Sequence, residues 1–239
     1  MNKINAVYTS LAALVVAVIA LVMCLICCNK KSANVEEVLN EKPELVINAM
    51  QNYEQKMRED AQKKAQQMIE ENSEALNNNP NDGVIANPDG KIVLVEFFDF
   101  SCGYCHRIYP AIKAIAAKNP DVKVVAKSLT FVSPVSSYAA KAALAAKNQG
   151  KYAEMYTAMF ENKGPLTEAK IDELAVANGL DLEKLKADMN SDLVKNTLNE
   201  TSELAGKIQV NGVPTLVLNG KVVQTLDEAV IQKEIDAAK

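Results

Sequence analysis

Two cysteines, Cys102 and Cys105, are the residues of this chain with the clearest capacity for chemistry. The thiolate is the nucleophilic form of cysteine, and two thiols separated by two residues form a disulfide that exchanges with other thiols. His106 follows the pair directly and is the single histidine among the 239 residues. The cluster therefore indicates thiol–disulfide exchange, haem attachment or half of a metal site.

Haem attachment and zinc binding are the two alternatives to redox chemistry. A CxxCH motif attaches c-type haem through both thiols and uses the histidine as an axial ligand. Haem attachment needs no preceding hydrophobic strand and no distant Val213-Pro214-Thr215 motif, and nothing marks one of the eight methionines as a sixth ligand. Zinc would need two more ligands, and Cys24, Cys27 and Cys28 lie in an apolar segment. Redox chemistry without a metal is favoured.

The segments around the dithiol predict a strand that leads into a helix. Residues 91–100 are β-branched and aromatic over the length of a strand. After the dithiol, apolar residues recur every three or four positions, as on one face of a helix. Cys102 is then expected in the first helical turn, where unpaired N–H groups and the helix dipole favour a thiolate. We interpret Cys102 as the attacking thiol and Cys105 as the resolving thiol.

The strand, the CxxC helix and the distant Gly212-Val213-Pro214-Thr215 segment together resemble the thioredoxin-fold proteins of the DsbA, DsbC and DsbG class, the bacterial thiol–disulfide oxidoreductases. In that class the proline is cis and its loop lies against the dithiol. The residue before the proline pairs with the substrate main chain as an added strand would. The resemblance implies that Val213, Pro214 and Thr215, together with Tyr104, bind substrate. An ordinary trans loop proline is the alternative for Pro214.

Glu96 matches the buried acid that lies beneath the active site of DsbA-like proteins, six residues before the first cysteine. Burial would raise the pKa of this carboxyl and suit it to exchange protons with Cys105. A solvent-facing glutamate on a half-exposed strand is the alternative. Strand alternation puts Leu94 and Phe98 on the same face as Glu96, which favours burial.

The subtype of enzyme is left open by the active-site residues. Gly103-Tyr104 resembles the dipeptide of disulfide isomerases and ScsC-like proteins, whereas Val213 before Pro214 resembles the oxidases of the DsbA type. The resemblance implies no cofactor beyond the redox-active disulfide Cys102–Cys105.

The N-terminal segment, residues 1–33, is predicted to be a signal anchor. Residues 11–28 are an unbroken apolar run that would span about 27 Å of bilayer as a helix. A lipoprotein and a cleaved signal peptide are the alternatives. Because disulfides persist in oxidising compartments, we expect the rest of the chain to face the bacterial periplasm or cell envelope.

Residues 34–80 are predicted to form a long helix followed by a linker at residues 77–83. Apolar residues step by three or four from Val46 to Leu76, in a narrow stripe that a lone helix does not bury. Such stripes usually pair with another helix. The arrangement resembles the N-terminal oligomerisation segment of DsbC-, DsbG- and ScsC-like proteins and implies a homo-oligomer. A solvated spacer is the alternative.

Residues 81–239 are predicted to form an α/β domain with the thioredoxin fold, which we expect to fold alone as a monomer. Residues 122–129 alternate as a second strand, and a helical insertion at about residues 134–205 resembles that of DsbA. A net charge of −4 without a basic cluster argues against nucleic acid as a partner.

The sequence thus predicts a thiol–disulfide oxidoreductase that acts on unfolded or misoxidised secreted proteins. A membrane redox partner of the DsbB or DsbD type would restore its dithiol. The alternative is a membrane-tethered surface antigen or chaperone-like binding module whose dithiol is incidental. The combination of CxxC, Glu96 and Val213-Pro214 favours the enzyme.

Overall fold

The computed structural model describes residues 15–24 and 35–239 of the chain. Part of the apolar run at residues 11–28 lies outside the described residues, and residues 15–24 within it are helical. In the described ranges, no helix has the length and apolar character needed to cross a bilayer. The chain divides into two compact units, Met1–Asp60 and Ala61–Lys239.

The first unit contains α2 (Val35–Glu41) and the first part of α3 (Glu44–Glu71), which continues into the second unit. Large apolar side chains of α3 within this unit are exposed to solvent. They are Leu45, Val46, Ile47, Met50, Tyr53 and Met57. The apolar stripe that predicts helix pairing is therefore uncovered within residues 35–60.

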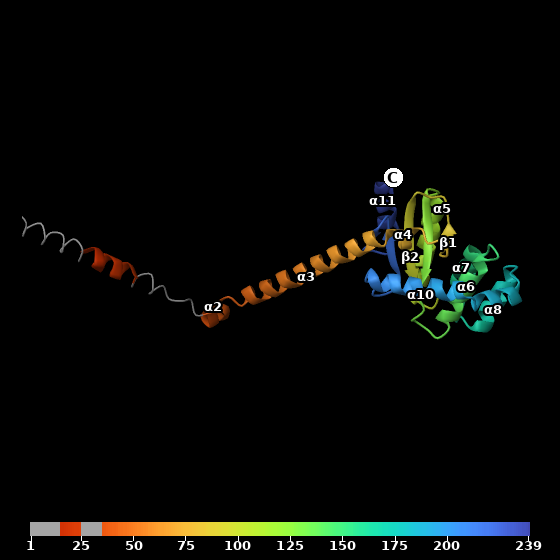
Figure 1. Ribbon diagram of the computed structural model, residues 1–239, viewed down its shortest axis with the longest axis horizontal. Coiled ribbons are helices and arrows are strands. Elements are labelled where there is room, and N and C mark those ends of the chain that lie inside the picture. The colour runs from red at the N-terminus through yellow and green to blue at the C-terminus, as the bar shows by residue number, and fades with distance from the viewer. Residues whose placement is uncertain (1–14, 25–34) are drawn as a thin grey trace, which may run out of the picture. The chain divides into compact units, whose positions relative to one another are not determined.

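The second unit is built on a five-stranded mixed sheet with the strand order β1-β3-β2-β4-β5 (Figure 1). β2 and β3 are parallel, and the other neighbouring strands are antiparallel. β2 and β3 are rich in β-branched or aromatic residues, which pack well on a pleated surface. The strands are β1 (Gly83–Ala86), β2 (Ile92–Phe98), β3 (Val122–Ser128), β4 (Thr215–Leu218) and β5 (Lys221–Val222).

One face of the sheet, here called the dithiol face, is formed in β2 by Leu94, Glu96 and Phe98, because side chains alternate along a strand. The helices α5 (Gly103–Lys118) and α11 (Glu228–Ala238) pack on this face through an aliphatic cluster. The helical members of the cluster are Ile108, Ile112, Ile115, Ile231 and Ile235. Their burial anchors α5, whose first turn carries the dithiol.

The opposite face, here called the α3 face, is formed in β2 by Val95 and Phe97. Ile69 at the end of α3 and Leu76 of α4 (Ser73–Asn77) are fully buried against this face. The packed domain therefore begins at residue 61 and not at residue 81, because these two side chains complete the core that covers the α3 face.

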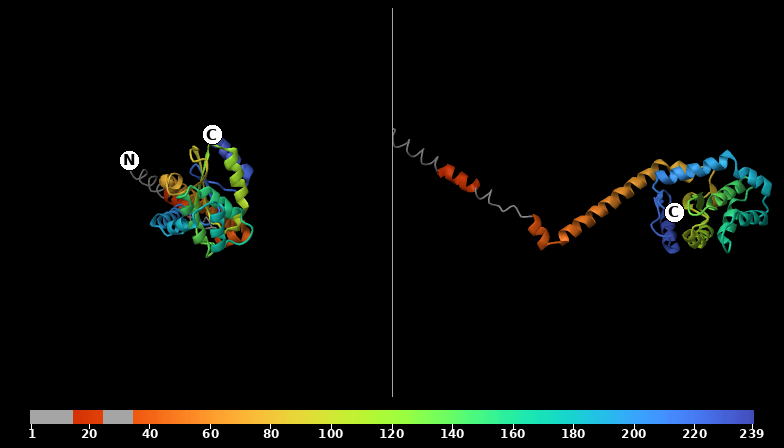
Figure 2. Two further views of the ribbon diagram at one scale, coloured as in Figure 1. Left: turned by 90° about the vertical axis from the view of Figure 1, so that its right-hand side faces the viewer. Right: turned by 90° about the horizontal axis from the view of Figure 1, so that it is seen from below.

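A helical insertion joins β3 to β4; most of it gathers at one side of the sheet, and its last helix runs back along the sheet (Figures 1 and 2). Three of its helices have N-cap residues, Thr167, Asp181 and Ser191, whose side chains each accept a hydrogen bond from a backbone N–H of the first turn. The helices of the insertion are α6 (Ser136–Lys147), α7 (Tyr152–Glu161), α8 (Glu168–Ala177), α9 (Leu182–Met189) and α10 (Asp192–Lys207).

The segment between α4 and β1, predicted as a free linker, is held by a buried ion pair. Lys127 of β3 pairs with Asp82, and both side chains are almost fully buried. The Lys127 Nζ atom also donates to the Ala75 carbonyl oxygen at 2.9 Å, and Lys147 Nζ donates to the Asp82 carbonyl oxygen at 2.8 Å. These contacts attach the end of the helical segment to β3 and α6.

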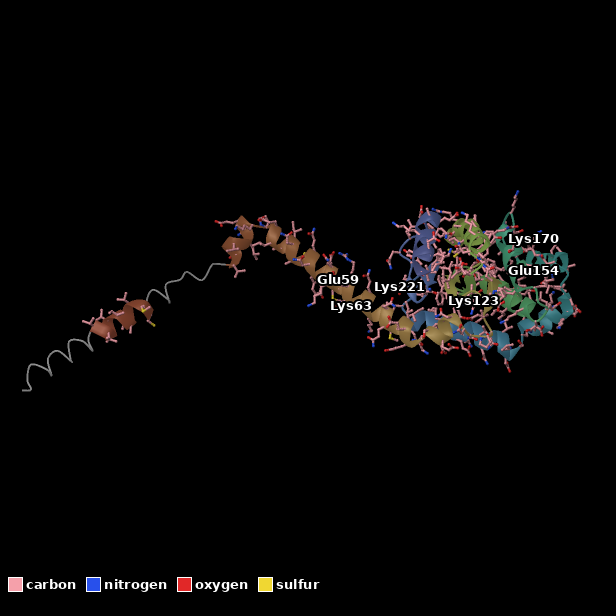
Figure 3. All side chains as sticks on the ribbon, turned by 90° about the horizontal axis from the view of Figure 1, so that it is seen from above. Glu59, Lys63, Lys123, Glu154, Lys170 and Lys221 are labelled. Carbon is pink, nitrogen blue, oxygen red and sulfur yellow. The ribbon has the colours of Figure 1, made fainter. Side chains whose placement is uncertain are left out.

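Acidic and basic side chains are interspersed over the surface of the second unit (Figure 3). Lys151 pairs with Glu154 at 3.0 Å, and Lys170 pairs with Glu173 at 2.7 Å. The second unit thus carries charges of both signs along its surface helices.

Candidate active site

The dithiol lies at the junction between β2 and α5, as predicted. Cys102 is the N-cap residue of α5 and has an extended backbone, and its carbonyl oxygen accepts a hydrogen bond from the His106 N–H at 3.1 Å. The first N–H groups of a helix lack intrahelical partners, and together with the helix dipole they favour a negative charge at this position. The structure therefore places Cys102 at the start of α5, next to the unpaired N–H groups of the first turn.

Both cysteines are buried in one cluster, and Cys105 is the more deeply buried of the two. Its side chain is fully buried in the cluster that includes Phe98, Phe100 and Tyr109. Burial raises the pKa of the Cys105 thiol well above its ordinary value, and the nearby Glu96 carboxylate raises it further. Both cysteines are free thiols in the structure. Cys105 thus needs a partner that takes or gives its proton.

The loop before β4 closes over Cys102. The Val213–Pro214 peptide bond is cis, in agreement with what the family resemblance implies. The Cys102 thiol lies 3.5 Å from the Val213 carbonyl oxygen, to which it donates. Thr215 is the first residue of β4, and its hydroxyl donates to the Gly212 carbonyl oxygen at 2.7 Å. The β4 strand, paired with β2, therefore brings Val213 to the dithiol.

Tyr104, the predicted fourth substrate contact, lies on the open side of α5. Its side chain is 57% exposed, and the guanidinium carbon of Arg107 lies 4.5 Å from the ring centroid. An aromatic ring with an adjacent cation has both an apolar surface and a polar rim to offer a polypeptide. Tyr104 thus lies at the surface, two residues after Cys102.

Glu96 is completely buried on the dithiol face, as strand alternation predicts. Burial raises its pKa to about 7 from an ordinary 4.5, while a hydrogen bond from the Tyr156 hydroxyl opposes the increase. The Tyr156 oxygen lies 2.6 Å from Glu96 Oε2. A carboxyl with this pKa exists in both protonation states near neutral pH, which suits proton exchange.

His106 is held between two backbone segments. Its Nε2 lies 2.8 Å from the Phe100 carbonyl oxygen, and its Nδ1 lies 3.2 Å from the Phe160 carbonyl oxygen. Carbonyl oxygens only accept hydrogen bonds, so the ring satisfies both contacts only when both nitrogens carry protons. As placed, neither nitrogen is free to ligate haem iron, and the histidine instead joins α5 to the end of β2 and to α7.

Asp99 and Tyr156 belong to this site and are absent from the sequence prediction. The buried Asp99 carboxylate accepts hydrogen bonds from the Ser101 N–H at 2.8 Å, the Val132 N–H at 3.0 Å and the Ser136 hydroxyl at 2.7 Å. Asp99 therefore fixes the turn that presents Cys102. An aspartate directly after a strand is a known turn signal and would have identified this role. Tyr156 has no such local signal, because its partner lies in a distant strand.

The comparison with protein families agrees with this geometry. The family model of the DSBA-like thioredoxin domain matches residues 93–236. Because the match covers more than half of the sequence, the chain belongs to the family of DSBA-like thioredoxin domains. The resemblance that the sequence motifs indicate is confirmed, and so is the thioredoxin-like α/β fold.

Two curated relatives illustrate the breadth of the family. A Na(+)/H(+) antiporter NhaA of Mycolicibacterium gilvum is 33% identical over 145 residues, which are 59% of this chain and 24% of the antiporter. The thiol:disulfide interchange protein DsbA of Pseudomonas aeruginosa is 30% identical over 138 residues, which are 55% of this chain and 65% of DsbA. The chain thus spans about a quarter of the length of the antiporter that it matches.

Two solved structures share the fold. A thioredoxin-like oxidoreductase from Silicibacter pomeroyi is 33% identical, with a TM-score of 0.66, and covers 69% of this chain and 96% of its own. A linker-deletion mutant of Proteus mirabilis ScsC is 25% identical, with a TM-score of 0.71, and covers 88% of this chain and 99% of its own. The ScsC likeness therefore includes part of the chain that precedes β2. The predicted enzyme class, a thiol–disulfide oxidoreductase, agrees with this family.

Proposed function

We propose that this chain exchanges disulfides with secreted polypeptides through the dithiol of Cys102 and Cys105, without a further cofactor. The observation that carries the proposal is the position of the Cys102 thiol, at the start of α5 and 3.5 Å from the Val213 carbonyl oxygen. The helix N-terminus favours a thiolate at Cys102, and the neighbouring loop offers main chain to an extended substrate.

The exchange proceeds through a mixed disulfide. A substrate thiolate attacks Cys102 Sγ of the enzyme disulfide, the Cys102–Cys105 bond breaks, and Cys105 leaves with the electron pair and takes up a proton. A second substrate thiolate then attacks the substrate sulfur of the mixed disulfide and expels Cys102 as a thiolate. Two electrons pass from the substrate dithiol to the enzyme. Isomerisation and reduction begin with the reverse attack by Cys102.

Glu96 serves as the proton donor and acceptor for Cys105. Its buried carboxyl has a pKa of about 7, and its charge influences the Cys105 thiol. Because burial raises the pKa of Cys105, a thiolate released there needs a proton at once. Glu96 supplies that proton in the oxidation direction and removes it in the reduction direction.

Substrate lies along the loop of Val213, Pro214 and Thr215, with Tyr104 on the exposed side of the dithiol. β-strand addition uses main-chain hydrogen bonds, so it accepts many sequences, as a general disulfide catalyst requires. The substrates are unfolded or misoxidised secreted proteins, and a membrane protein of the DsbB or DsbD type restores the dithiol state. This assignment places the domain in the periplasm or cell envelope, where disulfides persist, with residues 11–28 as its membrane tether.

The exposed apolar stripe of α3 in the first unit supports self-association. Its side chains from Leu45 to Met57 are exposed, and a narrow apolar stripe on a helix gains stability by pairing with another helix. Two or more dithiols on one assembly favour isomerisation, because they act on one substrate at high effective concentration. Light scattering of residues 34–239 and of residues 61–239 tests this. If residues 34–239 are monomeric, the first unit does not drive self-association and is a spacer.

Insulin reduction and the refolding of scrambled ribonuclease test the proposed function and separate its subtypes. Activity in both assays is expected for the unaltered protein. Cys102→Ser should reduce both to the uncatalysed rate, while Cys24→Ser, at an exposed cysteine outside the site, should leave them unchanged. A protein inactive in both assays would favour a binding module with an incidental dithiol.

A further inference from the structure

Tyr156 joins the helical insertion to the chemistry of the dithiol. It lies on α7 and is 1% exposed, and its hydroxyl donates to Glu96 Oε2 at 2.6 Å. Hydrogen bonds from a neutral donor to a carboxylate are short and strong compared with bonds between neutral groups. The contact therefore fixes one oxygen of the buried acid.

The second oxygen of Glu96 is in a different state. Glu96 Oε1 is buried and has no hydrogen-bond partner within residues 35–239. A buried carboxylate with an oxygen that no donor reaches is costly, and protonation relieves that cost by removing the charge. The asymmetry between the two oxygens thus marks Oε1 as the atom that carries the proton.

The surroundings of Tyr156 hold its hydroxyl in one place. Its ring lies in an aromatic cluster, with the ring centroids of Phe98 at 5.2 Å, Phe160 at 4.7 Å and Phe100 at 5.9 Å. Aromatic rings at such separations pack in defined orientations. The hydroxyl therefore has little freedom to leave Glu96, and the donor is pre-organised.

We propose that Tyr156 is a positioning residue for the proton step, which holds Glu96 through Oε2 so that Oε1 exchanges a proton with the Cys105 sulfur. The proposal deepens the proposed function and rests on it. When the enzyme disulfide opens, the Cys105 sulfur takes the proton from Oε1, and the Tyr156 hydrogen bond stabilises the carboxylate that remains. In the reduction direction, Oε1 receives the Cys105 proton while Cys105 attacks the Cys102 sulfur of the mixed disulfide and releases the substrate thiolate.

Among the described residues, three titratable groups interact electrostatically with Glu96. They are Tyr152 and Tyr156 from α7 and Cys105 from α5. Tyr152 provides a matched control, because it is buried on the same helix but its hydroxyl faces the Ala126 carbonyl oxygen at 3.4 Å. The two tyrosines thus differ in their contact with the acid and share their burial.

The test is the pH profile, from pH 5 to 9, of dithiol oxidation by the full-length protein with a peptide dithiol as the probe. The unaltered protein should show an inflection near pH 7 that Glu96→Gln removes. Tyr156→Phe should move the inflection upward by about one pH unit, because loss of a hydrogen bond to the charged form disfavours that form. Tyr152→Phe should leave the inflection in place.

A merely structural role for Tyr156 would lower stability and leave the inflection where it is in the unaltered protein, and that result overturns the proposal. If Tyr156→Phe does not fold, replacement of all tyrosines by 3-fluorotyrosine tests the same bond, because the more acidic phenol is a stronger donor. The inflection should then move downward, and an unchanged inflection overturns the proposal. Absence of dithiol oxidation in the unaltered protein would instead refute the proposed function itself.

Discussion

The two faces of β2 divide the work of the molecule between chemistry and stability. On the dithiol face, Glu96 is buried with one oxygen that has no hydrogen-bond partner within residues 35–239, and its charge raises the pKa of the Cys105 thiol. On the α3 face, Val95 and Phe97 pack against Ile69 and Leu76 in an apolar cluster. One strand thus holds a costly buried acid on one side because the other side is well packed. Substitutions on the two faces should therefore have different consequences.

Removal of the helical segment that covers the α3 face should have the largest effect. A chain that begins at residue 81 lacks Ile69 and Leu76, and each buried aliphatic side chain contributes about 2–5 kcal/mol. Because a whole domain is stable by only about 5–15 kcal/mol, residues 81–239 should be unfolded or nearly so, whereas residues 61–239 should fold. Circular dichroism during thermal unfolding compares the two. A cooperative transition for residues 81–239 near that of the longer chain would show that the α3 face does not need its cover.

The buried ion pair on the α3 face should be the most sensitive single position. Lys127→Met leaves Asp82 buried without its partner, so we expect a loss of about 3–5 kcal/mol in the free energy of unfolding. The double variant Lys127→Met/Asp82→Leu should recover most of the loss, because a buried pair replaced by apolar residues is often neutral. Urea denaturation measures the free energy of unfolding of the single and the double variant. Equal stability of the two variants would contradict this account.

The acid on the dithiol face should make stability depend on pH. The pKa of Glu96 is about 7 in the folded protein and near 4.5 when exposed, so the folded state retains a proton that the unfolded state loses. The free energy of unfolding should therefore fall as pH rises from about 4.5 to about 7, by about 3 kcal/mol in total.

Glu96→Gln should remove this dependence and be more stable than the unaltered protein above pH 7. Denaturation curves across this pH range test the expectation, with Glu234→Gln, at an exposed residue of α11, as the control. A parallel pH dependence in Glu96→Gln would mean that another group is responsible.

Tyr104, an exposed residue of α5 above the dithiol face, should have the smallest effect on stability. Tyr104→Ala should change the free energy of unfolding by no more than about 0.5 kcal/mol, because its ring is largely in solvent. The same substitution should raise KM for a peptide dithiol with little change in kcat, if Tyr104 contacts substrate as we propose. Steady-state kinetics separate the effect on KM from the effect on kcat. A change in kcat alone would show that Tyr104 acts on the dithiol and not on the substrate.

The parts of the site that lie close together in the sequence were predictable. A hydrophobic strand before CxxC and apolar spacing after it place Cys102 at a helix start, and strand alternation places Glu96 inside. The contact between Val213 and Cys102 is predictable only from the family resemblance, because 111 residues separate them. Tyr156 contacts Glu96 across 60 residues, and neither segment by itself predicts that contact.

The cover on the α3 face was harder to predict for a physical reason. Lys127 occupies an outward position by strand alternation, and a lysine there normally signals solvent. Its burial depends on Asp82 and the Ala75 carbonyl oxygen, which α4 and the following segment bring over the strand. Similarly, apolar residues recur at the same spacing along the whole of α3, but only those near its C-terminal end, such as Ile69, pack on the sheet. Periodicity identifies an apolar face and does not show which part of it is covered.

The long separation between β2 and β4 has a consequence for the maturation of the protein. Val93 and Asn219 are in contact across 126 residues, so β2 acquires its second neighbour only after β4 has been made. Contacts of such separation form late, because the intervening chain must first be ordered. A growing chain therefore presents its CxxC segment to the surroundings before the Val213 loop exists to cover it. Assembly of the dithiol site is thereby linked to synthesis of β4, and a chain that stops short of β4 carries the two cysteines without the Val213 loop beside them.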